Sequence, residues 1–191
     1  MKYYTGVGSR NTPQNILDLM VLIGEYLAEK GYTLRSGGAA GADKAFEAGC
    51  DNANGNKLIY LPWNSFQGNT IDNKKILLGV DDHSMDIASK HHPAWSRVGQ
   101  AGRKLMARNT YQVMDWDTET QTLDPVVDML ICWTPDGATD TTTIKTGGTG
   151  QAIRIARAHD IKVWNLQKTT HLHRIMGVVL KERYISPKEC N

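Results

Sequence analysis

The sequence is poor in the residues that cross-link small secreted domains or bind structural zinc. Its 191 residues contain only three cysteines, Cys50, Cys132 and Cys190. An odd number at such wide spacing excludes a disulfide framework and a zinc ribbon. We expect Cys132, which lies in an apolar stretch, to be an inert buried thiol.

Long apolar runs and a strong charge excess are also missing. The N-terminal stretch MKYYTGVGSR holds no apolar signal core, and no run is long enough to span a bilayer. These absences predict a cytoplasmic protein with no membrane partner. The net charge of +2 argues against a protein built mainly to grip a nucleic acid backbone, but it leaves a local basic groove open.

What the chain does contain is a regular alternation of strand and helix patterns. Strands are expected at residues 2–8, 32–37, 56–63, 126–133 and 161–166, and helices at 12–31, 41–50, 93–114, 149–160 and 171–184. This order is typical of an α/β protein with a Rossmann-like, mostly parallel sheet flanked by helices in a single domain. The strand at 126–133 is the most apolar and is expected to be central.

The expected organisation is a Rossmann-like nucleotide-binding domain over residues 1–168, followed by a C-terminal helix and loose tail at 169–191. A polar insertion with one short helix is expected at about 64–93, and a polar connector at 115–124. In the first helix, Thr12 is predicted to be the N-cap, Pro13 the first helical residue and Gly31 the stop. Five apolar residues of this helix fall on one face and are predicted to be buried: Ile16, Leu19, Met20, Ile23 and Leu27.

Three glycine-bearing loops flank elements whose ends meet at the carboxyl edge of such a sheet. They are GVGSRN at 6–11, RSGGAAGAD at 35–43 and KTGGTG at 145–150. Glycine lets the backbone approach a ligand closely, and a helix N-terminus offers free N–H groups to phosphate. The loops at 36–42 and 146–149 are therefore predicted to cradle phosphate, the alternative being ordinary tight turns. They match neither the ATPase P-loop nor the standard dinucleotide fingerprint.

The residues expected to contact the ligand lie in these loops and in one helix. Arg10, Arg35 or Arg108 is expected to supply positive charge. Thr134, Asp136 or Asp43 is expected to contact the sugar or base. The predicted ligand contacts are Gly8, Ser9, Arg10, Arg35, Ser36, Gly37, Gly38, Ala39, Gly41, Ala42, Asp43, Arg108, Asn109, Thr134, Pro135, Asp136, Thr146, Gly147, Gly148 and Thr149. Trp63 is either a stacking platform for a base or a tryptophan of the core or its rim.

Several of these stretches resemble a known family. GSR at 8–10 and GYTLRSGGAAGADKAFEAG at 31–49 resemble the G-S-R and S-G-x-A-x-G-I-D-x-x-A-H signature of the DNA-processing protein A (Smf) family. LMARNTYQV at 105–113 is similar to its arginine–asparagine segment, and residues 127–166 to its closing strand, glycine loop, helix and strand. The same SLOG superfamily contains the LONELY GUY-type phosphoribohydrolases. The resemblance covers most of residues 3–166 and implies a Rossmann-like fold with a nucleotide or nucleic acid pocket lined by these loops.

Two departures from the resemblance bear on catalysis. The phosphoribohydrolases carry P-G-G-x-G-T-x-x-E, whose glutamate does acid–base work, whereas TGGTGQAIR here ends in Arg154. The DNA-processing signature ends in a histidine, for which this chain has Glu47. A hydrolase would therefore need Asp43, Glu47 or Asp136 as its carboxylate.

Carboxylates and imidazoles, the side chains that bind metals, gather in the segment at 81–92. They are Asp81, Asp82, His83, Asp86, His91 and His92. Their spacing matches no metal signature, so a solvated insertion is the preferred interpretation and no metal is predicted. No Ser–His–Asp or Cys–His arrangement for nucleophilic catalysis is supported either.

The function predicted from these observations is binding of a nucleotide or nucleotide-derived small molecule, for sensing or sequestration. No obligatory cofactor is expected, only a nucleotide as ligand. Two alternatives stay open, namely binding of single-stranded DNA and N-glycosidic hydrolysis of a nucleoside phosphate. Homo-oligomers are also expected, although the apolar face of the helix at 93–114 fits core packing equally well.

Overall fold

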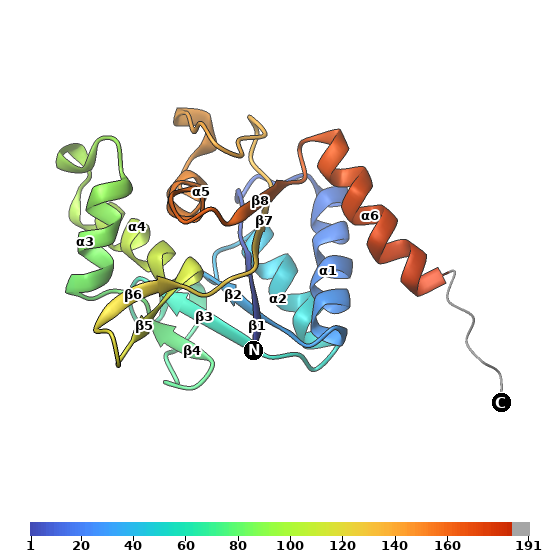
Figure 1. Ribbon diagram of the computed structural model, residues 1–191, viewed down its shortest axis with the longest axis horizontal. Coiled ribbons are helices and arrows are strands. Elements are labelled where there is room, and N and C mark those ends of the chain that lie inside the picture. The colour runs from blue at the N-terminus through green and yellow to red at the C-terminus, as the bar shows by residue number, and fades with distance from the viewer. Residues whose placement is uncertain (185–191) are drawn as a thin grey trace.

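The computed structural model describes residues 1–184, and its main element is a parallel sheet (Figure 1). The strands are β1 Lys2–Gly6, β2 Tyr32–Ser36, β3 Lys57–Leu61, β4 Ile76–Leu78, β5 Met114–Asp117, β6 Thr122–Pro125, β7 Met129–Cys132 and β8 Lys162–Asn165. Six of them form one sheet in the order β4-β3-β2-β1-β7-β8, in which every neighbouring pair is parallel. The other two, β5 and β6, form a separate antiparallel hairpin.

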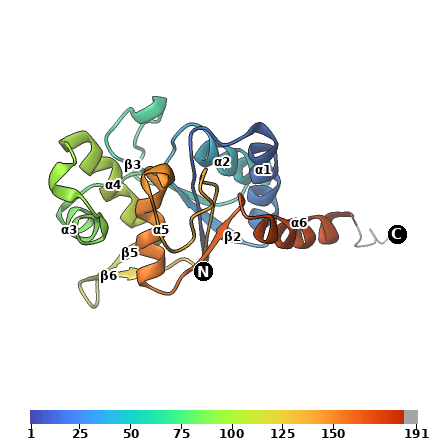
Figure 2. The same cartoon turned by 90° about the horizontal axis from the view of Figure 1, so that it is seen from above.

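Helices cover both faces of the sheet (Figures 1 and 2). The α-helices are α1 Gln14–Glu29, α2 Ala42–Asn52, α3 Asp82–His91, α4 Gln100–Val113, α5 Thr149–Ala158 and α6 Thr169–Tyr184. One core cluster joins α1, α2 and α6 to the sheet through residues such as Met20, Phe46 and Val179. A second cluster on the other face includes Val113 of α4 and Ile153 of α5. Short 3₁₀ turns complete the chain at η1 Phe66–Gly68, η2 Trp95–Arg97 and η3 Ile144–Thr146.

The predicted fold class is confirmed, because the parallel sheet and its flanking helices form a Rossmann-like α/β arrangement. The five apolar residues predicted to form the inner face of α1 are all buried. Gly31 follows the last residues of that helix with a φ of +77°, a conformation that glycine adopts without strain. The final helix begins at Thr169, two residues before the predicted start, and the predicted tail at 185–191 lies outside the described residues.

Several local predictions were wrong, each for a physical reason. Thr12 does not cap α1, because its hydroxyl donates to the Ser9 carbonyl at 2.8 Å and Pro13 takes the cap position. Residues 115–124 are not a connector but most of the hairpin β5–β6, whose register places Trp116 opposite Leu123. Such mixed polar and apolar stretches give a weak strand pattern, and pairing alone defines them as strands.

Two further segments differ from the sequence prediction in extent. The helix expected at 93–114 begins only at Gln100, since Gly99 is in an extended conformation and separates α4 from η2. The segment at 64–93 contains α3, as expected, and also β4, whose three residues pair with β3 at the edge of the sheet. The strand expected to be central, β7, lies between β1 and β8, whereas β2 and β1 occupy the middle. Within residues 1–184, no helix is both long and apolar enough to cross a membrane.

Glycines allow the close contact between α1 and α2, two helices that share one core cluster. A Cβ on Gly24 would lie 2.6 Å from the Phe46 carbonyl oxygen, and one on Gly49 would collide with the Val21 carbonyl. Both obstacles are backbone atoms, so no rotamer change could relieve them. The start of α2, and with it the glycine loop, is positioned by this contact.

We expect Gly49→Ala to lower the free energy of unfolding by about 2 kcal/mol or more, because overpacking outweighs the better helix propensity of alanine. The matched control is Gly177→Ala in α6, where a Cβ would meet nothing within 4 Å. This control is expected to raise the free energy of unfolding by about 0.5–1 kcal/mol. Urea denaturation of both variants checks the pair, and equal effects would contradict the helix-contact argument.

Candidate functional site

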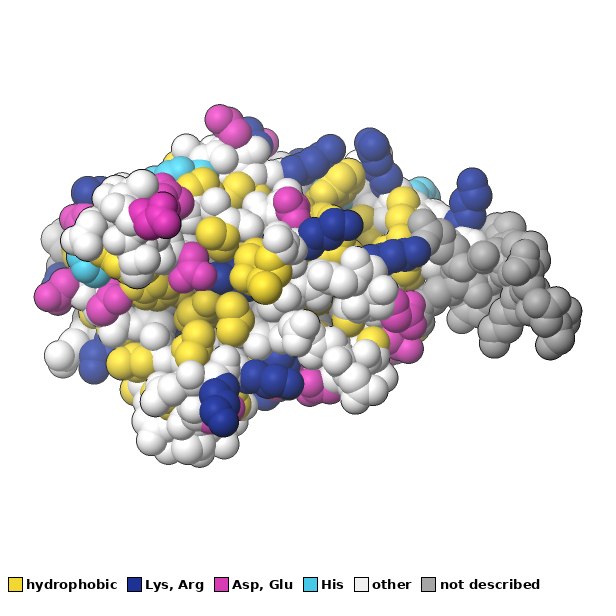
Figure 3. Space-filling view, turned by 60° about the horizontal axis from the view of Figure 1, so that its bottom comes forward, with side chains coloured by type: hydrophobic (Ala, Val, Ile, Leu, Met, Phe, Trp, Pro, Cys, Tyr) yellow, Lys and Arg dark blue, Asp and Glu magenta, His cyan; other side chains and the backbone are white. Residues whose placement is uncertain are grey.

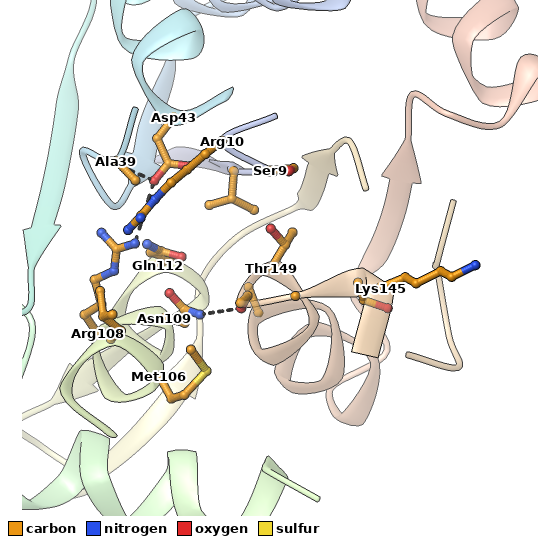
Figure 4. A pocket seen from close by; sticks show the side chains of 17 residues that line it. Ser9, Arg10, Ala39, Asp43, Met106, Arg108, Asn109, Gln112, Lys145 and Thr149 are labelled. Atoms are coloured by element: carbon orange, nitrogen blue, oxygen red, sulfur yellow. Dashed lines mark hydrogen bonds and ion pairs between the residues drawn. The ribbon is translucent and has the colours of Figure 1, made fainter. Parts of the chain in front are cut away.

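A cavity of about 390 Å³ opens at the carboxyl edge of the sheet, where the glycine loops meet one side of α4 (Figure 4). Its volume is within the range of roughly 300–1,000 Å³ that is usual for small-molecule sites. The lining residues come from the loop after β1, the loop between β2 and α2 with the first turn of α2, helix α4, and the segment from η3 to the start of α5. They are Val7, Gly8, Ser9, Arg10, Ala39, Asp43, Leu105, Met106, Arg108, Asn109, Gln112, Lys145, Thr146, Gly147, Gly148, Thr149 and Ala152.

Many of the residues predicted from sequence come together in this cavity, although they span more than a hundred positions of the chain. The predicted contacts found in its lining are Gly8, Ser9, Arg10, Ala39, Asp43, Arg108, Asn109, Thr146, Gly147, Gly148 and Thr149. The predicted contacts and catalytic candidates that do not line it are Arg35, Ser36, Gly37, Gly38, Gly41, Ala42, Glu47, Thr134, Pro135 and Asp136.

Asp43, in the first turn of α2, is buried beside the cavity and faces the second glycine loop. Its carboxylate accepts a hydrogen bond from the Ala39 N–H at 3.2 Å. Burial raises the pKa of Asp43 above its ordinary value, and backbone N–H groups of Gly8 and Gly37 oppose that shift. In this loop, N–H groups that a phosphate could have bound therefore donate to the protein's own Asp43 carboxylate instead.

Arg108 of α4 is the buried cation of the site. Its guanidinium donates to the Gly37 carbonyl, lies 5.2 Å from the centre of the Phe66 ring, and stands 4.0 Å from Asp43. Burial lowers the pKa of Arg108, the Asp43 charge opposes that change, and the nearby Arg10 charge adds to it. A Cβ on Gly37 would meet the ends of the Arg108 and Gln112 side chains, so the glycine lets both side chains lie against the loop in their present positions.

Arg10 brings a second guanidinium to the mouth of the cavity. The residue is exposed, and Figure 4 shows its side chain extending past Asp43 toward Arg108. The two guanidinium groups repel each other, and an anion bound between them would offset this repulsion. The arrangement therefore favours a negatively charged ligand. Lys145 also lines the cavity, but its side chain points away in the same view.

The start of α5 forms the opposite wall. No backbone acceptor in residues 1–184 takes a hydrogen bond from the Gly148 or Thr149 N–H groups. The Asn109 side chain holds this end in place by donating to the Gly148 carbonyl at 3.1 Å. A Cβ on Gly148 would contact only the Met106 methyl, at 3.5 Å. This wall therefore combines free N–H donors with open space, as an anion site at a helix N-terminus requires.

Asp136 does not contact the cavity but braces the loop that forms this wall. Its carboxylate accepts hydrogen bonds from the hydroxyls of Thr143 at 2.8 Å and Thr146 at 2.5 Å. Partial burial alone would raise the pKa of Asp136, but these bonds and one from Thr134 lower it to about 2. Thr134 is fully buried, and its hydroxyl accepts a bond from Asn165 at 2.7 Å. The sugar or base contacts predicted for Asp136 and Thr134 are thus replaced by bonds inside the protein.

Arg35 also makes its polar contacts within the protein. It is completely buried, donates to the Tyr111 and Met114 carbonyls at 2.8–3.0 Å, and pairs with Asp115 at 3.0 Å. Its guanidinium joins β2 to the end of α4 and the β5–β6 hairpin, so it supplies no charge to the cavity. Ser36 is also occupied, because its hydroxyl donates to the Gly6 carbonyl at 2.6 Å.

The remaining predicted contacts lie behind the cavity wall. Glu47 pairs with Lys44 at 2.8 Å and with Lys57 at 3.1 Å, which removes it as a candidate carboxylate for hydrolysis. Gly38 and Gly41 both have positive φ values and shape the loop, while Ala42 is buried in the core. Pro135 is exposed outside the cavity.

The histidine-rich segment and the candidate stacking residue also lie elsewhere. No group of three or more metal-ligating side chains occurs in the part of the chain that the structure describes. The His83 ring instead packs on Trp116, with ring centres 4.0 Å apart. Trp63 packs edge-on against Phe66 outside the cavity. Burial raises the pKa of the Cys132 thiol, as expected for an inert core cysteine.

Sequence reasoning missed several lining residues, of which Gln112 is the most informative. Its side chain is buried in the cavity wall one turn after Arg108, yet the i, i+4 spacing of Arg108 and Gln112 was visible in the sequence. Leu105 and Met106 provide apolar wall surface from the same helix. Lys145, Val7 and Ala152 complete the missed set. Small apolar residues such as Val7 and Ala152 carry no sequence signal for a site.

Comparison with known proteins gives a fold and no family assignment by sequence. No family model and no curated protein sequence matches this chain. DNA-processing protein A from Helicobacter pylori, whose structure addresses its binding of single-stranded DNA, matches with 14% identity and a TM-score of 0.54 over 96% of this chain and 80% of that one. The chain has the fold of DNA-processing protein A. The fold implied by the sequence resemblance is therefore confirmed.

Two further solved structures are similar at lower TM-scores. A structural genomics target shows 19% identity and a TM-score of 0.49 over 85% of this chain and 72% of that chain. A molybdenum cofactor binding protein from Rippkaea orientalis shows 13% identity and a TM-score of 0.42 over 94% of this chain and 97% of that chain.

We expect Asp43→Asn to lower the free energy of unfolding by about 3 kcal/mol, because it leaves the buried Arg108 cation without a counter-charge. Arg108→Met is expected to be destabilising in the same way, and the double variant to lose less than the sum of the two single losses. Urea denaturation of the four proteins measures this coupling. Strictly additive losses would show that the two charges do not support each other.

We expect Asp136→Asn to lower the free energy of unfolding by about 1–2 kcal/mol at pH 7, allowing for solvent screening of this partly exposed group. The pKa of Asp136 is lowered from 3.8 to about 2, so the stabilising contribution is present above pH 4 and is lost as the pH falls to 2. The difference between wild type and variant should therefore shrink over that range. A difference that stays constant with pH would rule out the ionised carboxylate as the brace.

Proposed function

We propose that this protein binds a nucleotide or nucleotide-derived small molecule in the cavity, with its phosphate at the start of α5. The observation that carries the proposal is the charge balance of the lining. The lining brings together two guanidinium groups, of Arg10 and Arg108, and one carboxylate, of Asp43. The balance is positive, and the free N–H groups of Gly148 and Thr149 add donors for an anion.

The size of the cavity supports a small ligand over a polymer. A chain of nucleotides needs a groove with basic and stacking residues along its length. On the face drawn in Figure 3, basic and acidic side chains both occur. Because the chain shares its fold with a protein that binds single-stranded DNA, binding of a single-stranded oligonucleotide is measured as well.

A second candidate function is N-glycosidic hydrolysis of the bound nucleotide, and Asp43 is the observation that favours it. Asp43 lines the cavity, and burial moves its pKa toward that of a proton donor. Of the three carboxylates predicted from sequence, Glu47 and Asp136 do not line the cavity. Chromatography for a released base, with Asp43→Asn as the comparison, separates turnover from sensing or sequestration.

Replacing Gly148 by glutamate tests phosphate binding. The open space around this position lets the new side chain enter without a clash, and its carboxylate would take the place of the phosphate. We expect Gly148→Glu to weaken nucleotide binding at least tenfold, which corresponds to about 1.4 kcal/mol. Isothermal titration with the four common nucleoside 5′-monophosphates measures it.

The control is Gly177→Glu, the same change in the open interior of α6, which should bind like the wild type. Equal affinities of the wild type and Gly148→Glu would refute phosphate binding at α5. A wild type that binds no monophosphate, but binds a single-stranded oligonucleotide with strong salt dependence, would favour the DNA-binding alternative.

A further inference from the structure

Gln112 carries a buried amide that the fold leaves without partners. The residue is 1% exposed, and neither its Nε2 nor its Oε1 atom has a hydrogen-bond partner among the described residues. Its main chain is used by the fold, because its backbone carbonyl accepts a hydrogen bond from the Thr5 hydroxyl at 2.5 Å. Buried polar side chains are normally paired, and an unpaired one destabilises the fold. Its retention therefore needs another explanation.

Arg108 lies one helical turn before Gln112 and also carries an unpaired hydrogen-bond donor. The Nε atom of Arg108 is buried and has no partner in the described chain, although the end of the same guanidinium contacts Gly37 and Asp43. Both the Arg108 guanidinium and the Gln112 amide lie against Gly37, so the two groups are neighbours. Both residues also line the cavity, on the same side of α4 (Figure 4).

The unpaired atoms form a definite chemical pattern. The Gln112 amide offers a donor and an acceptor side by side, and Arg108 Nε offers a further donor. A planar group that carries its own donor next to an acceptor is complementary to this set. Nucleobase edges and carboxamides have that property, whereas a phosphate or a bare sugar lacks the matching planar pair.

We propose that Gln112 and Arg108 Nε form the subsite that recognises the planar, hydrogen-bonding edge of the ligand, and that Gln112 is its main specificity-determining residue. This inference rests on the proposed function, because it assigns the α4 wall to the base while the α5 wall takes the phosphate. Leu105 and Met106 supply apolar surface beside this subsite. The Gln112 amide is then hydrogen-bonded only in the complex. Ligand binding therefore removes the free-energy penalty of leaving this buried amide unpaired.

Gln112→Met tests the subsite, because methionine has a similar length and volume but offers no amide. The probes are the nucleoside 5′-monophosphate that the wild type binds most tightly and ribose 5-phosphate, which has the sugar and phosphate without a base. We expect the variant to bind the nucleotide at least tenfold more weakly and ribose 5-phosphate within twofold of the wild type. Its melting temperature without ligand should not fall, since an unpaired buried amide is removed.

Gln112→Glu is the second variant, because it keeps an acceptor beside Arg108 but removes the donor. Its order of preference among the four monophosphates should differ from that of the wild type. Gly148→Glu completes the set, because it should weaken the nucleotide and ribose 5-phosphate alike.

The outcomes separate this inference from the proposed function. If Gln112→Met binds the nucleotide like the wild type while Gly148→Glu loses both probes, phosphate binding stands and the Gln112 subsite is wrong. A variant that melts lower and loses both probes equally would assign Gln112 a structural role, which also overturns the subsite. If the wild type binds neither probe, the proposed function fails and this inference with it.

Discussion

The shape of the cavity depends on the packing of the Arg108 guanidinium against the second glycine loop. The guanidinium donates to the Gly37 carbonyl and lies in the space that a Cβ at residue 37 would occupy, and it approaches Asp43 from the α4 side. This contact joins α4 to the second glycine loop and the start of α2. Burying the cation is tolerable because Asp43 is buried with it, and backbone N–H groups in turn hold the carboxylate.

The polar side chains near the carboxyl edge of the sheet fall into two groups, which differ in whether the protein itself supplies their hydrogen-bond partners. Arg35, Ser36 and Asp136 have their hydrogen bonds satisfied within the protein. Within residues 1–184, the Gln112 amide and the Nε atom of Arg108 have no such partner, and both residues line the cavity. Because an unpaired buried polar group destabilises a protein, this pair carries the proposal of a ligand subsite on α4. Residue type alone does not separate the groups, since an arginine belongs to each.

The sequence predicted the elements whose signal is local. Apolar residues at helical spacing identified α1, and alternating strand and helix patterns identified the parallel sheet and its class. Elements without such a signal were missed or misjudged, as with the three-residue strand β4 and the polar hairpin β5–β6, which exist through pairing with other segments. The glycine loops were found at the correct edge, but their glycines serve close packing as much as any ligand.

By itself, the sequence determined the fold class, the position of the site at the carboxyl edge of the sheet, and three of its loops, because these follow from local patterns and the geometry of parallel sheets. Only the tertiary structure decided which polar residues face the cavity. Arg35 bonds to Tyr111, 76 positions away, and Gln112 meets the loop at Gly37 with its amide unpaired. Such partners are set by long-range packing, so no local pattern separates an arginine that holds the fold from one that faces a ligand.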